Sequence, residues 1–112
     1  MDVELDLHRL AELQVLLGTE LPEIVATLVS ELTSALSGID AGLGAGDLGA
    51  VALAAHAARN SALMIDARPM LGFLAELETS ARQDEHEAAS AANERLRASW
   101  PALRARLEQI GQ

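Results

Sequence analysis

The sequence predicts an all-α fold, an up-down-up-down four-helix bundle with an additional short N-terminal helix. Of its 56 hydrophobic residues, 42 are alanine or leucine, and only nine are the β-branched residues valine and isoleucine. This mixture favours helix over strand. Apolar residues also recur every three or four positions in successive segments, which is the period of an amphipathic helix. Helices that are joined by short turns and carry one apolar stripe each pack most simply as a bundle.

The length and charge of the chain limit what it can be. Its 112 residues are expected to form a single domain, since compact domains commonly contain about 100–150 residues. There is no cysteine, and 17 acidic residues against eight basic ones give a net charge of −9. Proteins that bind nucleic acid need a basic face, so nucleic acid is not an expected partner.

The chain is expected to be cytoplasmic and to make no contact with a membrane. No apolar run approaches the roughly 20 residues that a membrane-spanning helix needs. The N-terminal residues 1–6 are acidic, whereas a secretory signal begins with a cationic stretch.

Capping residues delimit the first two helices. Asp6 can cap a short helix over residues 7–17, which ends at Gly18. Thr19 can cap the second helix, and Pro22 is tolerated there because it falls in the first turn. The apolar stripe of the second helix consists of Leu21, Ile24, Leu28, Leu32, Leu36 and Ile39.

The glycine-rich segment 41–46 is interpreted as the turn into which the second helix frays. It lacks the Gly-Lys-Ser/Thr ending of a phosphate-binding P-loop, and no predicted strand precedes it. We therefore expect it to connect two helices rather than to bind a nucleotide.

Aspartates also mark the starts of the next two helices. Asp47 is expected to cap a third helix over residues 48–65, and Asp66 a fourth over residues 67–82. Pro69 lies in the first turn of the fourth helix, where proline is tolerated.

A last helix is expected to follow the polar connection 83–87 and to reach Ile110. Pro101 should kink this helix or split it at Ser99 and Trp100, because proline removes a hydrogen bond inside a helix. The residues expected to face inward are Ala89, Ala92, Leu96, Leu103, Leu107 and Ile110.

Several classes of catalytic and metal site are excluded by their motifs. There is no cysteine nucleophile and no Gly-x-Ser-x-Gly elbow. His8, His56 and His86 lie on three different segments, and none has a glutamate three residues before it, as a di-iron bundle requires. None has a second histidine or cysteine at the spacing of a zinc site, so no metal site is expected.

The third helix carries the most informative pattern. Its predicted buried stripe is Leu48, Val51, Ala55, Ala58, Ala62 and Ile65. His56 follows Ala55, so it is rotated by about 100° from that stripe. Arg59, one turn later, can donate charge-assisted hydrogen bonds to an anion on the imidazole, and Ser61 adds a hydroxyl nearby. These residues alone suit either a phosphate-accepting histidine or an ordinary exposed histidine beside an arginine.

A longer stretch of the sequence resembles the histidine-containing phosphotransfer (HPt) domain family. The segments that carry the resemblance are Gly46-Asp47-Leu48, Ala54-Ala55-His56-Ala57-Ala58-Arg59-Asn60-Ser61, Ile65-Asp66-Ala67 and Leu74-Ala75-Glu76-Leu77-Glu78. The family pattern is Gly-Asp-Leu, then Ala-His-x-Leu-Lys-Gly-Ser/Ala, then Leu-Gly-Ala, then a leucine-rich helix that ends in Glu or Gln. The layout of five helices also agrees.

The resemblance implies a role for individual residues. His56 corresponds to the phosphorylated histidine, Arg59 to the basic residue that contacts the phosphate, and Ser61 to the small hydroxyl residue five positions after the histidine. Glu78, 22 positions after His56, corresponds to the residue that orients the imidazole. The residues expected to contact a partner are Leu53, Asn60, Ser61, Leu63 and Met64.

Four positions depart from the family pattern. Arg59 replaces a lysine and keeps the charge, although its planar fork binds phosphate with a different geometry. Asn60 replaces a glycine that leaves room for a partner, and its amide can instead hydrogen-bond that partner. Ala58 replaces a leucine and thins the core below the site. Asp66 replaces a second glycine and is expected to cap the next helix.

The function implied by the resemblance is that of a phosphorelay intermediate in two-component signalling, without kinase or phosphatase activity of its own. The implied partners are response-regulator receiver domains and a hybrid histidine kinase, and Mg²⁺ is expected in the receiver rather than in this chain. The chain is expected to be a monomer.

Three different functions compete with this one. A histidine-kinase dimerisation domain fits less well, because Ala57 stands where that class has an acidic residue. A protein-binding helical module without phosphotransfer would use the same exposed surface but would not need His56. A purely structural bundle would need neither the histidine nor a partner.

Overall fold

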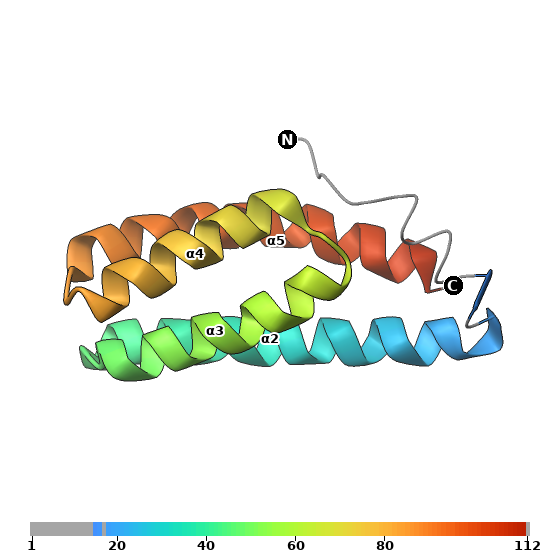
Figure 1. Cartoon of the computed structure of the whole chain (residues 1–112), viewed down its shortest axis with the longest axis horizontal. Helices are drawn as coiled ribbons and strands as arrows, with labels where there is room; N and C mark the ends of the chain where they lie inside the picture. Colours follow the sequence, from blue (N-terminus) through green and yellow to red (C-terminus); the bar gives the residue numbers. More distant parts are fainter. Residues whose placement is uncertain (1–14, 17, 112) are drawn as a thin grey trace.

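The computed structural model describes residues 15, 16 and 18–111, and four long helices dominate it (Figure 1). A 3₁₀ turn, η1 (Gly18–Glu20), leads into α2 (Leu21–Ala45), α3 (Leu48–Met64), α4 (Arg68–Arg82) and α5 (His86–Ile110). α2 packs against α3 and α5, and α4 packs against the same two helices, so the four close a bundle. The predicted all-α bundle is confirmed. Of the predicted N-terminal helix, only Val15 and Leu16 are among the described residues, and both are helical.

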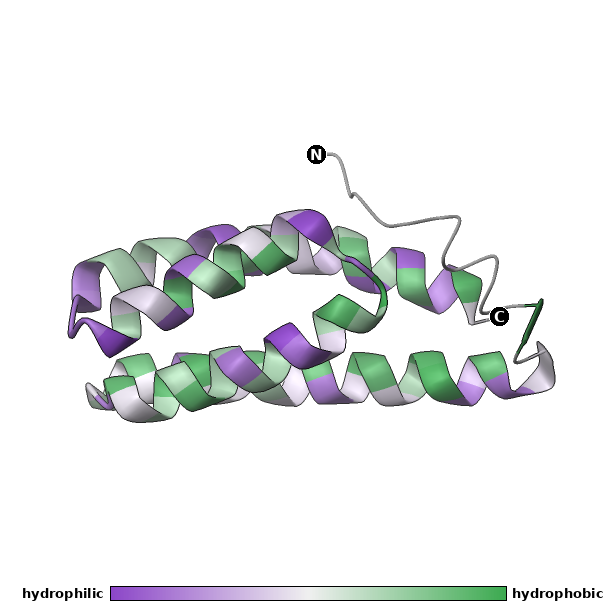
Figure 2. Cartoon of the chain, in the orientation of Figure 1, coloured by the Kyte–Doolittle hydropathy of each residue, from purple (hydrophilic) through white to green (hydrophobic). Residues whose placement is uncertain are grey.

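The core is built from the apolar stripes of all four helices. Figure 2 shows hydrophobic and hydrophilic residues interspersed along each ribbon, with much of α2 hydrophobic. Burial of aliphatic side chains is the main stabilising contribution in such a bundle. The largest fully buried side chains are Leu32, Leu36, Ile39, Val51, Ile65, Met70, Leu74, Leu77, Leu96 and Leu107.

One helical segment could cross a membrane by length and composition alone. This segment is Gly18–Ala45, which contradicts the expectation that no part of the chain is long and apolar enough. Its scattered serines, threonines and acids break the apolar run without making the helix polar. Seven residues of α2 are buried against the other helices, and a single helix of this composition is weak evidence for a membrane span.

The glycine-rich segment 41–46 is helical up to Ala45, so the prediction that the second helix frays into it was wrong. The turn is confined to Gly46 and Asp47. Gly46 adopts the left-handed conformation, with φ of 71°, and its N–H bonds back to the last turn of α2. Asp47 caps α3 as predicted, because its Oδ1 accepts a hydrogen bond from the N–H of Ala50.

Two other predicted caps were wrong. Thr19 lies inside η1, and Glu20 precedes the first residue of α2 without capping it through its side chain. Asp66 has a φ of 48° and its carboxylate pairs with Arg68, so Ala67 is the residue that precedes α4. The left-handed conformation explains why a glycine suits this position, and aspartate is one of the few other residues that tolerate it.

α5 is one uninterrupted helix, so the predicted split at Pro101 does not occur. Trp100 and Leu103 are buried on either side of the proline, and this packing holds the helix together despite the missing hydrogen bond. Of the residues predicted to face inward, Ile110 is only half-buried, and the other five are buried.

Candidate functional site

The third helix presents His56 to solvent, as its rotation from the apolar stripe predicted. Ala55, directly before His56, and Ala58, two positions after it, are both buried beneath α3. The His56 side chain is 56 % exposed, so its ring is open to an approaching protein. The small buried alanines let α3 lie close to its neighbours, and this fixes the direction in which the histidine points.

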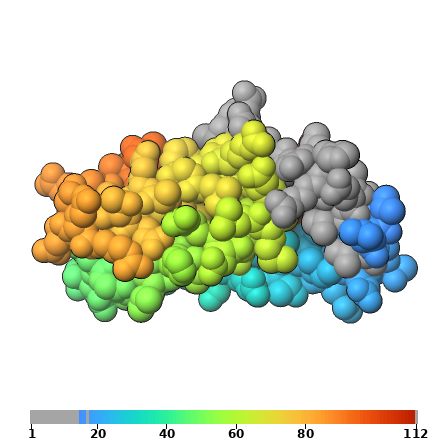
Figure 3. Space-filling view, viewed as in Figure 1, coloured from blue at the N-terminus to red at the C-terminus, as the bar shows by residue number. Residues whose placement is uncertain are grey.

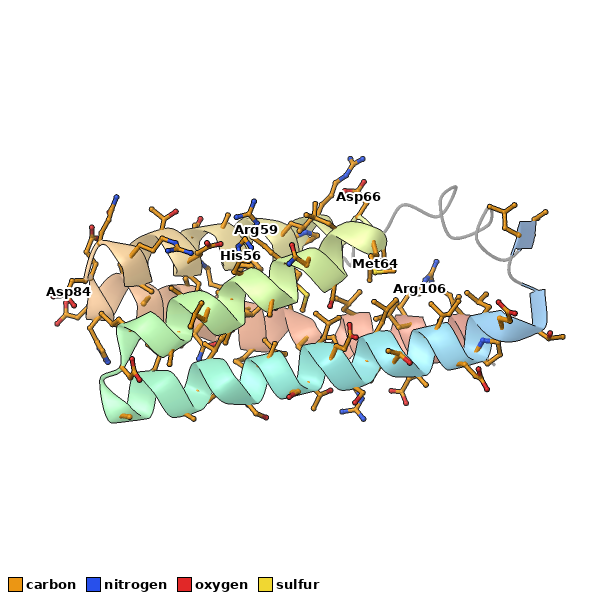
Figure 4. All side chains as sticks on the ribbon, turned by 60° about the horizontal axis from the view of Figure 1, so that its bottom comes forward. His56, Arg59, Met64, Asp66, Asp84 and Arg106 are labelled. Carbon is orange, nitrogen blue, oxygen red and sulfur yellow. The ribbon has the colours of Figure 1, made fainter. Side chains whose placement is uncertain are left out.

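Glu78 reaches this histidine from the neighbouring helix α4. The Glu78 Oε2 atom lies 3.3 Å from Nδ1 of His56, within reach of a hydrogen bond. Leu74 and Leu77 are buried on α4 and hold this part of the helix against α3. Figure 4 shows His56 and Arg59 on neighbouring turns of α3. The pairing of His56 with Glu78, which was expected only from the family resemblance, is thus present in the fold.

Two arginines hold the Glu78 carboxylate. Arg59 donates from a guanidinium nitrogen to Oε1 at 3.1 Å. Arg82 donates twice to Oε2, from Nε at 3.1 Å and from a terminal nitrogen at 2.9 Å. Arg82 was not predicted from the sequence, although its position four residues after Glu78 on one helix is a recognisable signal for an ion pair.

The carboxylate of Glu78 is therefore both buried and charged. Burial raises the pKa of Glu78, but the hydrogen bonds from Arg82 and Arg59 and the nearby His56 and Arg82 charges outweigh it. The net result is a pKa below the ordinary value of 4.5, so Glu78 is ionised at neutral pH.

This arrangement selects one form of the imidazole. An ionised carboxylate can only accept hydrogen bonds, so it favours the tautomer of His56 that carries its hydrogen on Nδ1. The Nε2 atom then keeps a free lone pair on the exposed side of the ring. A neutral histidine held in this way is a nucleophile that needs no further base.

Ser61 is not brought into the site. Its side chain is buried, and its hydroxyl donates a hydrogen bond to Oε2 of Glu31 on α2, at 3.0 Å. The structure therefore places Ser61 against α2 rather than on the surface that surrounds His56. In this position it links two helices of the bundle.

The other residues expected to contact a partner lie on the exposed side of α3. Leu53, Asn60 and Leu63 stand three before, four after and seven after His56, which places all four on one face of the helix. Leu53 is 72 % exposed, and Leu63 and Met64 are about half exposed. We call Leu53, His56, Asn60, Leu63 and Met64 the α3 face. In the space-filling view α3 lies open to solvent beside α4 (Figure 3).

Within residues 15, 16 and 18–111, no three histidine, aspartate or glutamate side chains come together in a way that could hold a metal ion. Asp66 and Asp84, labelled in Figure 4, lie at the two ends of α4 and far from each other.

Comparison with known proteins identifies the family. The family model of the Hpt domain matches residues 23–112 of the sequence. Among solved structures, the chain is similar to histidine-containing phosphotransfer protein B (HptB) from Pseudomonas aeruginosa PAO1, with 31 % sequence identity and a TM-score of 0.89. This match covers 96 % of the present chain and 94 % of the other. A search of curated proteins gave no match. The chain therefore belongs to the Hpt domain family and is a phosphorelay intermediate of two-component signalling.

Proposed function

We propose that His56 is the residue on which this phosphorelay intermediate carries the phosphoryl group. The observation that supports this most directly is the pairing of an exposed imidazole with a buried, ionised carboxylate through Nδ1. His86, the other described histidine, is paired differently: its Nε2 lies 3.2 Å from the backbone oxygen of Leu43.

The proposed reaction moves a phosphoryl group from an aspartate of a receiver domain to His56. The lone pair of Nε2 attacks phosphorus, an N–P bond forms, and the P–O bond of the aspartyl phosphate breaks. The aspartate leaves as a carboxylate on the receiver, while His56 keeps the hydrogen on Nδ1 and becomes a phosphoimidazolium. Glu78 stabilises this positive ring, and the reverse steps deliver the phosphoryl group to a second receiver.

Arg59 is proposed to neutralise charge on the transferred group. It lies one turn after His56 on α3, so its guanidinium can turn from Oε1 of Glu78 to a phosphoryl group on the ring. Its side chain is 40 % exposed and has room for this movement. Arginine binds phosphate through charge-assisted hydrogen bonds, and phosphoryl transfer depends mainly on positioning and on such charge neutralisation.

The partners follow from this chemistry. Hpt domains of phosphorelays interact with receiver domains and kinases. For this chain we propose response-regulator receivers and a hybrid histidine kinase that act in the cytoplasm. We expect Mg²⁺ to be supplied by the receiver, and the chain to bring no cofactor and to act as a monomer.

The α3 face is the proposed docking surface for the receiver. Leu53, Leu63 and Met64 offer apolar contact area around His56, and the amide of Asn60 can donate and accept hydrogen bonds there. Exposed apolar side chains that surround a reactive group are typical of an interaction site.

The test is transfer of radiolabelled phosphate from a panel of phosphorylated receivers of the same genome. The protein, its His56→Gln variant and a matched control, His86→Gln, are offered to each receiver. Label should appear on the wild type and on His86→Gln as an acid-labile and alkali-stable adduct, and should be absent from His56→Gln.

Three further outcomes would contradict this function. Labelling of His56→Gln would place the phosphoryl group elsewhere in the chain. Binding of a receiver without transfer would identify a docking module, and neither binding nor transfer would leave a structural bundle.

A further inference from the structure

We propose that Arg82 is a positioning residue of the phosphotransfer site, which holds Glu78 against His56 and neutralises its carboxylate when Arg59 turns to the phosphoryl group. This inference rests on the proposed function of His56 and names a residue that the reaction itself does not touch. Arg82 donates both of its hydrogen bonds to Oε2, the same oxygen that lies beside Nδ1 of His56.

The two arginines differ in the helix from which they reach Glu78. Arg59 is on α3, one turn from His56, and makes a single hydrogen bond to Oε1. Arg82 is on α4, one turn after Glu78 itself, and makes two hydrogen bonds. A glutamate followed four residues later by an arginine is the favourable orientation for an ion pair on a helix. Arg82 therefore lies on the same helix as Glu78, whereas Arg59 lies on the same helix as His56.

The burial of Glu78 favours an arrangement in which the two arginines have different roles. The Glu78 side chain is only 10 % exposed with both guanidiniums in place, so these two groups supply its hydrogen bonds in place of water. A buried carboxylate without a compensating cation is strongly unfavourable. If Arg59 were the sole arginine partner, its movement to the phosphoryl group would leave only the His56 ring beside the carboxylate. With Arg82 in place, the carboxylate stays ionised and paired while Arg59 moves.

Arg82 also determines where Oε2 lies. Its Nε and terminal nitrogen both point at this oxygen and leave the carboxylate little freedom to rotate about its last bond. Without them, only the hydrogen bond from Arg59 to Oε1 holds the carboxylate, so the oxygen that accepts from Nδ1 is less fixed and the tautomer of His56 is selected less strongly. Outer partners of this kind, which orient a histidine through a carboxylate, commonly change activity by about 10–100-fold when they are removed from metal sites.

The experiment compares Arg82→Gln and Arg82→Lys with a matched control, Arg95→Gln. Arg95 also pairs with a glutamate of α4, Glu76, but on an exposed part of the helix away from His56. The first readout is the ¹⁵N chemical shifts of the His56 ring above pH 8 in the isolated protein, which report the nitrogen that carries the hydrogen. The second is the rate of phosphoryl transfer from a receiver.

We expect the wild type and Arg95→Gln to show the Nδ1–H tautomer and equal transfer rates. In Arg82→Gln the ring should shift toward the Nε2–H tautomer that free histidine prefers, and transfer should slow by about tenfold or more. Arg82→Lys, which keeps the charge but not the fork, should fall between them. Arg82→Gln that matches the wild type in tautomer and rate would overturn the proposal.

A double variant separates a positioning role from direct contact with the receiver. If Arg82 acts through Glu78, then Arg82→Gln should have no further effect on the transfer rate in a Glu78→Gln background. An undiminished tenfold effect in that background would overturn the proposal. The ring measurement needs no phosphate donor. A wild type with the Nδ1–H tautomer that never accepts a phosphoryl group would therefore contradict the role of His56, while the tautomer shift in Arg82→Gln would still show that Arg82 holds Glu78 against His56.

Discussion

At the scale of single residues, the site depends on a carboxylate that is buried and yet charged. Glu78 accepts hydrogen bonds from Arg59 and Arg82 and lies beside Nδ1 of His56. Each of these side chains has a different exposure, and the most buried member of the cluster directs the most reactive one. The chemistry of His56 is therefore expected to depend on Glu78, a side chain that is itself almost buried.

The ionisation of Glu78 should appear as a pH-dependent contribution to stability. A carboxyl group whose pKa is lowered by folding stabilises the protein above its unfolded pKa, and this contribution is lost as the pH falls through the folded pKa. At pH 7, Glu78→Gln should lower the free energy of unfolding by about 1 kcal/mol, because charge-assisted hydrogen bonds are lost. The difference from wild type should shrink below about pH 4.5. Urea denaturation at pH 7 and at pH 3 measures both values.

Glu76→Gln provides the control for that measurement. Glu76 lies two residues away on the same helix and pairs with Arg95, but it is exposed. Exposed ion pairs contribute about 0–1 kcal/mol, so this variant should differ little from wild type at either pH. An equal pH-dependent loss in both variants would contradict the assignment to Glu78.

Ser61→Ala tests whether this hydroxyl belongs to the bundle or to the partner surface. Because Ser61 is buried and donates to Glu31, its removal should destabilise the fold by about 1 kcal/mol in thermal or urea denaturation. The rate of phosphoryl transfer should not change. Ser37→Ala, an exposed serine on α2, is the control for stability. A variant of normal stability that transfers slowly would place Ser61 at the interface instead.

The residues of the site differed in how far the sequence could predict them. His56 and Arg59 were found because both lie on one helix, where spacing determines which side chains are neighbours. Glu78 came only from the family resemblance, since nothing in the pattern states which face of α4 meets α3. The inward direction of Ser61 was missed for the same reason: it depends on how closely α2 and α3 approach, and spacing along one helix does not contain that distance.

At the scale of elements, the end of α2 shows how close packing overrides local propensity. Glycine disfavours helix, yet residues 41–45 remain helical because Gly42 lets α2 and α3 meet. A Cβ atom on Gly42 would lie 2.7 Å from a methyl group of Val51 and 3.2 Å from the backbone oxygen of Asp47. The same rule explains the uninterrupted α5, whose buried side chains hold the helix together across Pro101.

Two glycines of this segment should respond in opposite ways to the same substitution. Gly42→Ala should destabilise the protein by about 1–3 kcal/mol, because the new methyl group overlaps Val51 and backbone atoms of the facing turn. Gly44→Ala should stabilise it by about 0.5–1 kcal/mol, since that position is helical and has open space around it. Thermal denaturation of the two variants beside wild type tests both. Changes of the same sign would contradict the close contact at Gly42.

Aspartates at helix boundaries could be located from the sequence but not assigned a role. Asp47 caps α3 as predicted, whereas Asp66 takes a left-handed conformation and pairs with Arg68. Both residues suit a turn, and the choice between the two roles depends on the direction in which the next helix leaves. That direction is a property of the packed bundle.

At the scale of the whole molecule, the candidate site lies on one pair of helices, and the other pair supports them. α3 and α4 carry the site, while α5 lies diagonally across the bundle from α3 and packs mainly against α2 and α4. Figure 4 shows Arg106 of α5 far from His56. The fold class followed from composition and periodicity, but this division between helix pairs required the order in which the helices pack.

Binding of a receiver should therefore depend on α3 and not on α5. Leu53→Asp, in the α3 face, should weaken binding by about tenfold or more, since it places a charge in an apolar contact. Ala98→Asp introduces the same charge on the exposed side of α5 and should leave binding unchanged. Titration calorimetry with a receiver that transfers phosphate compares the two. Equal weakening would mean that net charge, rather than the α3 face, controls association.

The dimensions of the chain allow its oligomeric state to be measured. The Cα radius of gyration is 14.2 Å, and the molecule extends over 43 × 23 × 18 Å. A monomer should give a radius in small-angle X-ray scattering close to this value, increased only by the hydration layer. A markedly larger radius that falls on dilution would instead indicate self-association.

The short link between α3 and α4 has a consequence for how this protein can change over time. Every group proposed to act on the phosphoryl group lies between Asp47 and Arg82, on two adjacent helices joined by the turn at residues 65–67. The proposed site thus lies on one contiguous helical hairpin, and α2 and α5 support that hairpin from behind. Their outer faces are free to diversify, so new partners can be gained there without any alteration of the transfer reaction.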